Sequence, residues 1–363
     1  MGDGTFGETV DVAVIGAGIS GLHLARGLLA HDVSVVVFEG RDRIGGRLRS
    51  EPTSSGHRLD DGLDQRLGHR IDVGATWFWP GERRVAQLVR DFALPIHQQH
   101  LAGDAMYEAP DGVRRLDGNP IDVPSFRFSG GAEELASRLA ADLPGGALRL
   151  STAVTRVSGT GPFTVGHGRG ELTAGHVVLA LPPALAISSI VIDPPLPESI
   201  GRIARATPVW MGATTKAVAV YDQPFWRDAG LAGSAMSHVG PLREIHDMSG
   251  SRRRPAALFG FGQPTSGESI GRDDVVRQLA RLFGPAAADA QEVIVVDWRS
   301  ESLTSPTGVE QLRSYELFGH PALHAPVDRP LHWSSTETAR ESPGHIEGAL
   351  DAAERTLAAI LSG

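Results

Sequence analysis

Cysteine is absent from the 363 residues of this chain. Its absence excludes disulfide bonds, thiolate catalysis, zinc–thiolate sites and cofactors attached through cysteine, and we expect no metal site. Long apolar runs are also missing, because no stretch approaches the roughly 18 residues that a membrane-spanning helix needs. The residues before Val10 have neither the basic start nor the apolar core of a secretory signal. We therefore expect a cytoplasmic protein without a membrane span.

Lysine is almost absent as well. Of the 34 basic residues, Lys216 is the single lysine and the others are arginines. Coding pressure from a high-GC genome explains such a bias. Lysine is compact and can lose its proton when buried, whereas the guanidinium group is bulkier and always charged. A lysine retained under this pressure indicates a position that arginine cannot serve, and chance survival of a surface lysine is the alternative.

Acidic residues outnumber basic ones, with 43 Asp and Glu against 34 Lys and Arg and a formal net charge of −9. A net negative chain lacks the basic surface of a general nucleic-acid binder, so we expect no nucleic-acid partner. The hydrophobic share of 41% and the charged share of 21% are typical of a globular protein. At roughly 150 residues per domain, the length favours two domains.

The first forty residues predict a strand–helix–strand unit, with a strand over Val10–Ile15, a helix over Ile19–His31 and a second strand over Val33–Phe38. A G-x-G-x-x-G turn joins the first strand to the helix, and an acid closes the second strand. These residues are Gly16, Gly18, Gly21 and Glu39. Such glycines let the backbone approach a pyrophosphate at the helix N-terminus, and the acid accepts hydrogen bonds from ribose hydroxyls. The pattern predicts dinucleotide binding.

The remaining pattern alternates between helical and strand-like segments. We expect an irregular connection between Leu101 and Phe128, which is rich in Gly, Pro and Asp. Helices are predicted over 85–94, 132–143, 273–283 and 345–361, and strands over 71–77, 148–157, 163–165, 177–181, 210–221 and 293–298.

With these motifs in place, the chain resembles the flavin-containing amine oxidase superfamily, which includes monoamine, polyamine and L-amino-acid oxidases. The resemblance rests on separated motifs in the family's order. They are Val14–Gly21 with Glu39, Arg43–Arg47, Asp72–Trp77, Gly130-Gly131, Thr152–Val154, Lys216 with Tyr221–Trp226, Ser335–Ala339 and Gly344–Gly348. It implies an α/β fold, in which a Rossmann-like FAD-binding domain is assembled from discontinuous segments beside an α+β substrate-binding domain. The expected FAD-binding segments are 1–76, 129–190 and 323–363, and the expected substrate-binding segments are 77–128 and 191–322.

The resemblance also implies FAD in an extended pose, held non-covalently because no cysteine is available. The glycine turn would contact the pyrophosphate, Glu39 the adenosine ribose, and the backbone of Val154 the adenine. The N-terminus of the last helix would point at the flavin, where it stabilises negative charge. In full, the residues expected at the cofactor are Gly16, Gly18, Ile19, Ser20, Gly21, Glu39, Gly40, Arg41, Gly45, Gly46, Arg47, Gly74, Ala75, Thr76, Trp77, Val154, Glu337, Thr338, His345 and Ile346.

Lys216 matches the family's lysine, which holds a water close to the flavin N5. The implied chemistry is hydride transfer from the carbon of an amine or amino-acid C–N bond to the flavin. Dioxygen then reoxidises the flavin and yields hydrogen peroxide, and the imine hydrolyses. Two alternatives stay open: a desaturase or dehydrogenase acting on a C–C bond, and a flavin-binding protein with degraded catalysis.

The chain departs from the family at the aromatic cage that orients the amine. One cage residue is usually a tyrosine where this chain has His345, and the other falls near Pro306-Thr307, where no aromatic stands. Tyr315 could substitute if its loop folds back, and with Trp298 and His345 it forms the expected substrate pocket. The chain is also short for the family, with the deficit in the substrate-binding part. The partners expected are a small amine-type molecule and dioxygen, and the sequence does not indicate the oligomeric state.

Overall fold

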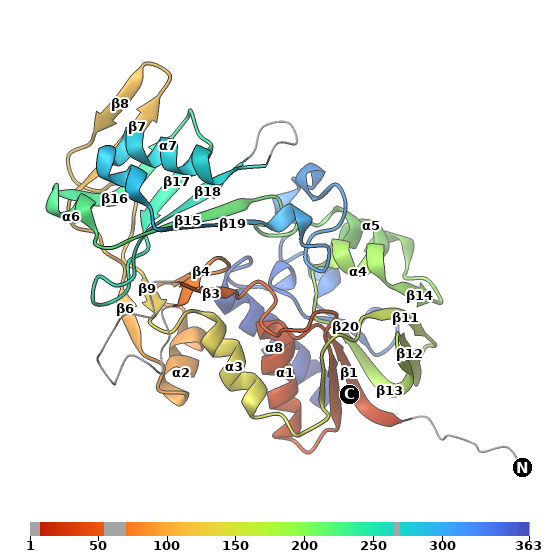
Figure 1. Cartoon of the computed structure of the whole chain (residues 1–363). Coiled ribbons are helices and arrows are strands. Elements are labelled where there is room, and N and C mark those ends of the chain that lie inside the picture. Colours follow the sequence, from red (N-terminus) through yellow and green to blue (C-terminus); the bar gives the residue numbers. More distant parts are fainter. Residues whose placement is uncertain (1–7, 54–69, 264–268, 363) are drawn as a thin grey trace, which may run out of the picture.

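The computed structural model describes residues 8–53, 70–263 and 269–362. Its first large sheet lies beside α1 and α8 in Figure 1. The strands of this sheet are β1 (Thr9–Ile15), β2 (Val35–Phe38), β10 (Leu148–Arg149), β11 (Val154–Ser158), β12 (Phe163–His167), β13 (Gly170–Leu179), β14 (Val191–Asp193) and β20 (Leu331–Trp333). They follow the order β10-β2-β1-β13-β12-β11-β14, and β20 pairs with the end of β13.

Strands β10, β2, β1, β13 and β20 pair in parallel, which is the arrangement expected of a dinucleotide-binding unit. Ile15 lies opposite both Phe38 and Leu179, so three strands end at one edge. The Gly-rich turn and Glu39 follow directly after this edge. In doubly wound sheets the carboxyl ends of the strands form the ligand-binding side.

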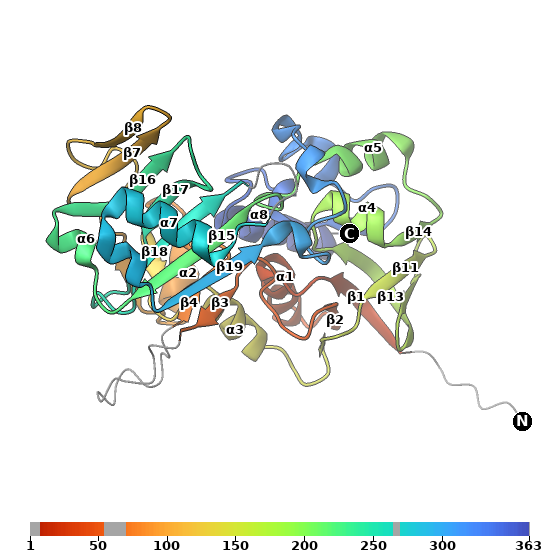
Figure 2. The same cartoon turned by 45° about the horizontal axis from the view of Figure 1, so that its top comes forward.

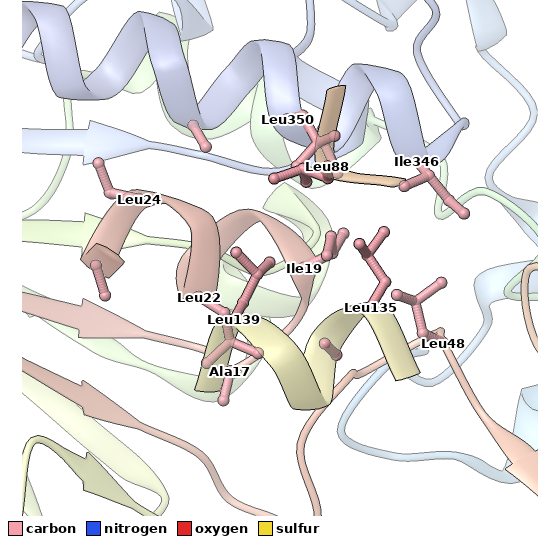
Figure 3. Close-up of a cluster of buried hydrophobic side chains, with 14 of the residues drawn as sticks. Ala17, Ile19, Leu22, Leu24, Leu48, Leu88, Leu135, Leu139, Ile346 and Leu350 are labelled. Carbon is pink, nitrogen blue, oxygen red and sulfur yellow. The ribbon is translucent and has the colours of Figure 1, made fainter. Parts of the chain in front are cut away.

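Three helices cover one face of this sheet: α1 (Ile19–Leu29), α3 (Glu133–Ala141) and α8 (Ile346–Leu361). Their apolar faces meet in one core, in which Leu22, Leu139 and Leu350 are fully buried (Figure 3). A Cβ added to Gly27 would lie 2.7 Å from Leu357, so glycine permits the close approach of α1 and α8. Helix α2 (Arg83–Asp91) adds its buried Val85 and Leu88 to the same core.

The second large sheet comes from other parts of the chain. Its strands are β7 (Asp104–Ala109), β8 (Gly112–Arg115), β15 (Thr215–Tyr221), β16 (Leu231–Ser237), β17 (Leu242–Asp247), β18 (Ala256–Gly262) and β19 (Glu292–Asp297), in the order β19-β15-β18-β17-β16-β7-β8. Helix α7 (Arg272–Phe283) covers one face (Figure 2). Because side chains alternate along a strand, Ala217 and Ala219 pack toward α7, whereas Val218 and Val220 pack with Val73 on the other side.

The smaller elements lie in the connections between strands of the two sheets. They are β3 (Ser50–Pro52), β4 (Arg70–Asp72), β5 (Trp77–Phe78), β6 (Ile96–Gln98), β9 (Phe126–Phe128), α4 (Pro183–Ser189), α5 (Glu198–Ala206) and α6 (Phe225–Asp228). Within the described part of the chain, no helix combines the length and apolar character needed to cross a bilayer.

Three sequence-based expectations are wrong. The stretch 101–128 contains β7, β8 and β9, and its pattern is weak because every residue of β8 is exposed. The expected strand 148–157 is two strands, β10 and β11, interrupted around Ser151, which has a positive φ of 49°. The expected strand 71–77 is likewise divided into β4 and β5.

The fold is a mixed α/β structure in which two large sheets share one chain. Each large sheet draws on separate chain segments, so the chain passes between them several times. The expected boundary at residue 190 cuts β14 from its own sheet, because β14 pairs with β11. We propose that this boundary lies after α5 instead.

Candidate active site

A cavity of about 760 Å³ lies between the carboxyl edge of the first sheet and the inner face of the second. It brings together residues that are far apart in the sequence. Of the predicted site residues, its lining contains Gly16, Gly18, Ile19, Ser20, Glu39, Gly40, Arg41, Gly45, Gly46, Arg47, Gly74, Ala75, Thr76, Trp77, Val154, Lys216, Trp298, His345 and Ile346. The lining does not contain Gly21, Tyr315, Glu337 or Thr338.

The three glycines of the turn after β1 have different structural roles. Gly16 has a φ of +113°, which side chains disfavour. A Cβ on Gly21 would lie 2.0 Å from the carbonyl oxygen of Gly16, so Gly21 serves close packing behind the turn. A Cβ on Gly18 would meet nothing within 4 Å. The open space at Gly18 and the N-terminus of α1, which has no side-chain cap, together form an approach suited to an anion.

Glu39 follows β2 and is only 6% exposed. Its Oε2 accepts a hydrogen bond from the backbone N–H of Ala17 at 3.0 Å, and its Oε1 accepts one from Arg41 at 3.0 Å. These bonds fix the carboxylate against the cavity wall. A carboxylate has about four acceptor sites, so acceptor capacity remains for a ligand.

Arg47 is paired with Glu337, a contact that sequence analysis did not predict. The two side chains form a bidentate ion pair with distances of 2.6 and 3.1 Å, and the backbone N–H of Trp210 donates to the same carboxylate. Glu337 is fully buried. Burial raises its pKa, but the charge and hydrogen bonds of Arg47 outweigh this effect and hold the pKa below its usual value. Glu337 therefore fixes Arg47 from behind the cavity wall.

Thr338 also lies behind the wall, where its hydroxyl donates to the carbonyl of Ser335. Its neighbours Ser335 and Thr336 line the cavity in its place. The Thr-Glu-Thr segment of the sequence thus supplies one lining residue and two supporting ones.

Lys216 lies on β15 with its side chain toward the cavity and is 4% exposed. Its Nζ donates to the carbonyl oxygen of Gly74 at 2.5 Å and lies 5.4 Å from the centre of the Phe261 ring. Burial lowers the pKa of the ammonium group to about 7, and the charge of Asp72 opposes that shift only in part. Lys216 can therefore hold or release a proton near neutral pH.

Trp298 supports the same strand connection. Its indole Nε1 donates to the carbonyl oxygen of Val73 at 3.0 Å, and the side chain is 2% exposed. The segment that carries Gly74 therefore accepts two hydrogen bonds, one from Lys216 on β15 and one from Trp298 just after β19. This fixes the position of the segment that the sequence predicts beside the flavin ring.

The aromatic wall differs from the prediction. Tyr315 is 54% exposed and packs edge-on against Trp210, with ring centres 6.4 Å apart. Trp210 itself lines the cavity, as does Trp79, whose ring centre lies 4.7 Å from that of His345. Trp79 lies just after the expected strand 71–77 and Trp210 begins the expected strand 210–221, but no motif of the sequence pointed to either as a lining residue. Sequence analysis also missed the pairing of His345 with Glu82, whose closest atoms, Nδ1 and Oε1, lie 2.6 Å apart.

A polar cluster lines another part of the cavity wall and was not predicted. His246 contacts Asp122 at 2.6 Å through Nδ1 and Glu244 at 3.0 Å through Nε2. Burial lowers the pKa of His246, but the hydrogen bonds and charges of the two carboxylates outweigh burial and raise it to about 9. Glu244 lies opposite Phe261, which in turn lies opposite Lys216, so the cluster is two strands away from the lysine.

The residues present suit an elongated dinucleotide with an aromatic head. The uncapped helix N-terminus and the open Gly18 suit a pyrophosphate, and the buried carboxylate of Glu39 suits ribose hydroxyls. Ala75, Trp77 and Trp298 provide the apolar and aromatic walls that a flat ring requires.

Comparison with known proteins agrees with this geometry. The family model described as flavin containing amine oxidoreductase matches residues 19–125 and 111–361. A putative flavin-containing monoamine oxidase of Mycobacterium tuberculosis is 30% identical over 444 aligned positions, which cover 97% of this chain and 96% of the relative. Putrescine oxidase of Kocuria rosea is 24% identical, and the alignment covers 97% of this chain and 95% of the relative.

Solved structures show the same fold. A putrescine oxidase double mutant superposes with a TM-score of 0.82 at 22% identity, covering 98% of this chain and all of that one. Cyclohexylamine oxidase from Brevibacterium oxydans superposes with a TM-score of 0.80 at 22% identity, covering 97% and 99%.

The alignment of 444 positions exceeds the 363 residues of this chain, so the relative carries segments that are missing here. The two matched stretches of the family model meet at residues 111–125, which precede β9 and include Asp122 of the cavity wall. The family match covers most of the chain, and its description names a flavin cofactor. The chain therefore belongs to the family of flavin-containing amine oxidoreductases and uses FAD.

Proposed function

We propose that this protein is an FAD-dependent oxidase that removes a hydride from the carbon of an amine or amino-acid C–N bond. Dioxygen is the proposed final acceptor, with hydrogen peroxide and a hydrolysed imine as products. The observation that carries the proposal is the buried Lys216, which shares a cavity with Glu39 and the turn at Gly18. The residues suited to a dinucleotide thus share one cavity with a buried amine donor.

The roles of the lining residues follow from their chemistry. FAD, when bound, supplies the acceptor for the hydride. Glu39 would accept from the ribose, and the N-terminus of α1 would hold the pyrophosphate. Val154 would support the adenine, whereas Gly74 and Trp77 would lie along the flavin ring. Ile346 begins α8, so its backbone N–H would face the same ring.

Lys216 is proposed to order a water at the reaction site. Its Nζ has three donors and the Gly74 carbonyl takes one, so donors remain for a water. The apolar surroundings of Phe261 and Trp298 keep bulk water away and strengthen such a hydrogen bond.

The test is a peroxide-coupled screen of the purified, FAD-loaded protein. Putrescine, benzylamine and L-leucine represent diamines, aromatic monoamines and amino acids. Peroxide formation with any of them supports the proposal and gives the substrate class. Flavin reduction without peroxide under air would indicate a dehydrogenase, and no reduction by any amine under anaerobic conditions would contradict amine oxidation altogether.

A further inference from the structure

His345 and Glu82 form a carboxylate–imidazole pair in the cavity wall. The Nδ1 atom of His345 lies 2.6 Å from Oε1 of Glu82. The other oxygen of Glu82 accepts a hydrogen bond from the backbone N–H of Trp79 at 3.0 Å, so the carboxylate is held from two sides. An ionised carboxylate only accepts hydrogen bonds, so Nδ1 carries the proton and donates. The second ring nitrogen, Nε2, is then left with its lone pair.

The imidazole ring is fixed in this orientation. Trp79 lies against it at 4.7 Å between ring centres, with an angle of 35° between the planes. The hydroxyl of Thr336 donates to the carbonyl oxygen of His345 at 2.9 Å and accepts from the N–H of Gly344 at 2.7 Å. These contacts hold both the ring and the backbone that carries it.

The free nitrogen is accessible from the cavity. The side chain of His345 is 35% exposed, whereas that of Glu82 is 8% exposed. Within the described residues, Nε2 makes no hydrogen bond, and His345 lines the cavity that also contains Lys216. The arrangement is that of a general base: an oriented imidazole with one nitrogen donating to a carboxylate and the other open to a ligand.

We propose that His345 is the catalytic base that removes a proton from the ammonium form of the substrate, with Glu82 as its positioning residue. The proposal rests on the proposed amine oxidation. In this step one N–H bond of the ammonium group breaks, its electron pair stays on the substrate nitrogen, and a new N–H bond forms at Nε2. No electrons are transferred. The neutral amine then has the lone pair that assists departure of the hydride from the adjacent carbon.

The surrounding charges favour this transfer. Glu82 contacts the ring directly and compensates the positive charge that His345 gains. Around the start of α8, Arg84 of α2 forms ion pairs with four carboxylates, those of Glu341, Glu347, Asp351 and Glu354. Glu337 is paired with Arg47. Lys216 is the competing base in the cavity, but its Nζ donates to the Gly74 carbonyl in this structure. The experiment must therefore separate His345 from Lys216.

The kinetic test compares H345Q, H345Y and E82Q with wild type, using the best amine from the screen. A general base contributes roughly 10²- to 10⁴-fold, so we expect kcat/KM of H345Q at pH 7 to fall at least about 100-fold. The deficit should shrink about tenfold per pH unit as solvent deprotonates the substrate. H345Y keeps an aromatic wall but no base and should behave like H345Q. E82Q should show a smaller loss with the same pH trend.

The controls use residues outside this pair. H238Q alters an exposed histidine and should leave the pH profile unchanged. Flavin content shows whether each variant retains its cofactor. A deficit in H345Q that does not change with pH would mean a packing role only, and equal rates would overturn the proposal. If kcat/KM recovers at high pH in K216M but not in H345Q, the base is Lys216 instead of His345.

A second readout does not depend on turnover. The compound α,α-dimethylbenzylamine has no hydrogen on the carbon next to nitrogen, so it can bind but cannot be oxidised. Nitrogen-15 NMR of histidine-labelled, FAD-loaded protein should show the His345 ring neutral and protonated at Nδ1, with the signal assigned by its loss in H345Q. Saturation with the probe should protonate Nε2.

A ring that stays neutral at saturation overturns the base role. In E82Q the neutral ring should populate both tautomers, and an unchanged tautomer would contradict the positioning role of Glu82. The two proposals fail separately. If the protein forms peroxide and H345Q has wild-type kinetics, only the proposed base role of His345 fails. If the probe protonates His345 but no amine is oxidised, only the proposed oxidase function fails.

Discussion

Lys216 donates a hydrogen bond from Nζ to the carbonyl oxygen of Gly74, which lies 142 positions away in the sequence. The bond links β15 of the second sheet to the connection that follows β4. Trp298 donates to the adjacent carbonyl, that of Val73. The segment proposed to lie along the flavin is thus positioned by the sheet that forms the opposite wall. A change at Lys216 therefore acts on geometry as well as on charge.

The first prediction concerns Lys216→Met, which keeps the length of the lysine stem up to Cε and removes the donor Nζ. FAD should stay bound, because none of the groups assigned to the phosphates is altered. Turnover or flavin reoxidation should fall at least about tenfold, equivalent to about 1.4 kcal/mol of barrier. Stopped-flow measurement of the two half-reactions locates the loss.

Lys216→Arg is the matched control for charge. We expect it to be impaired too, because a planar, always charged guanidinium does not fit a buried site built for a compact amine. Wild-type rates in both half-reactions of this variant would contradict the proposed role of Lys216 and leave it a structural role only.

The second prediction is that Glu39→Ala weakens FAD retention. The substitution removes a buried carboxylate that accepts from the N–H groups of Ala17 and Arg41, and it removes the proposed ribose acceptor. Hydrogen bonds to charged groups contribute roughly 1.5–3 kcal/mol, so FAD affinity should fall by at least about tenfold. Equilibrium dialysis measures this, and Glu39→Gln should lose less. Unchanged affinity in both variants would contradict the ribose role.

The third prediction is that the flavin is released on denaturation. The chain has no cysteine, and we expect no histidyl link. Precipitation with acid should therefore leave a colourless pellet and a yellow supernatant. Yellow colour that stays with the precipitated protein would show a covalent link.

Most residues expected at the cofactor line the cavity, whereas several other residues of its wall were not expected. The glycine turn and Glu39 are local, because a few consecutive residues fix both the strand end and the helix start. Lys216 was identified by its rarity and by a family motif. Trp210 and Asp122, which line the cavity, and Glu82, which contacts His345, were missed because tertiary contacts place them there. The residues next to them in the sequence do not indicate those contacts. Tyr315 was expected in the pocket, whereas it supports Trp210 from outside.

The fourth prediction concerns the pH dependence of folding stability. The pKa of His246 is raised to about 9 in the folded protein by Asp122 and Glu244, despite its burial. A raised histidine pKa stabilises the fold fully below about pH 6.5, and the contribution is lost as the pH rises toward 9. Asp122, whose pKa is lowered, stays ionised throughout this range.

The difference in unfolding free energy between wild type and His246→Gln should therefore be largest near pH 6 and smaller near pH 9, by on the order of 2 kcal/mol. Urea denaturation at both pH values, with saturating FAD, measures it. His238→Gln, at an exposed site, should show no such trend. A difference that grows with pH would contradict the charged state assigned to His246.

The last prediction concerns the pair of Arg47 with Glu337, in which the carboxylate is fully buried and also accepts from the N–H of Trp210. Removing one partner of a buried ion pair leaves an uncompensated charge, so Glu337→Ala should destabilise the protein by about 3–5 kcal/mol. The exposed pair of Arg156 with Asp193 serves as control, because Arg156→Ala should cost less than about 1 kcal/mol. Chemical denaturation of the two variants with saturating FAD compares them directly. The double variant Arg47→Met with Glu337→Leu removes both charges and should recover part of the stability lost in Glu337→Ala. Equal costs for the buried and the exposed pair would show that Glu337 does not fix Arg47 in the way the structure indicates.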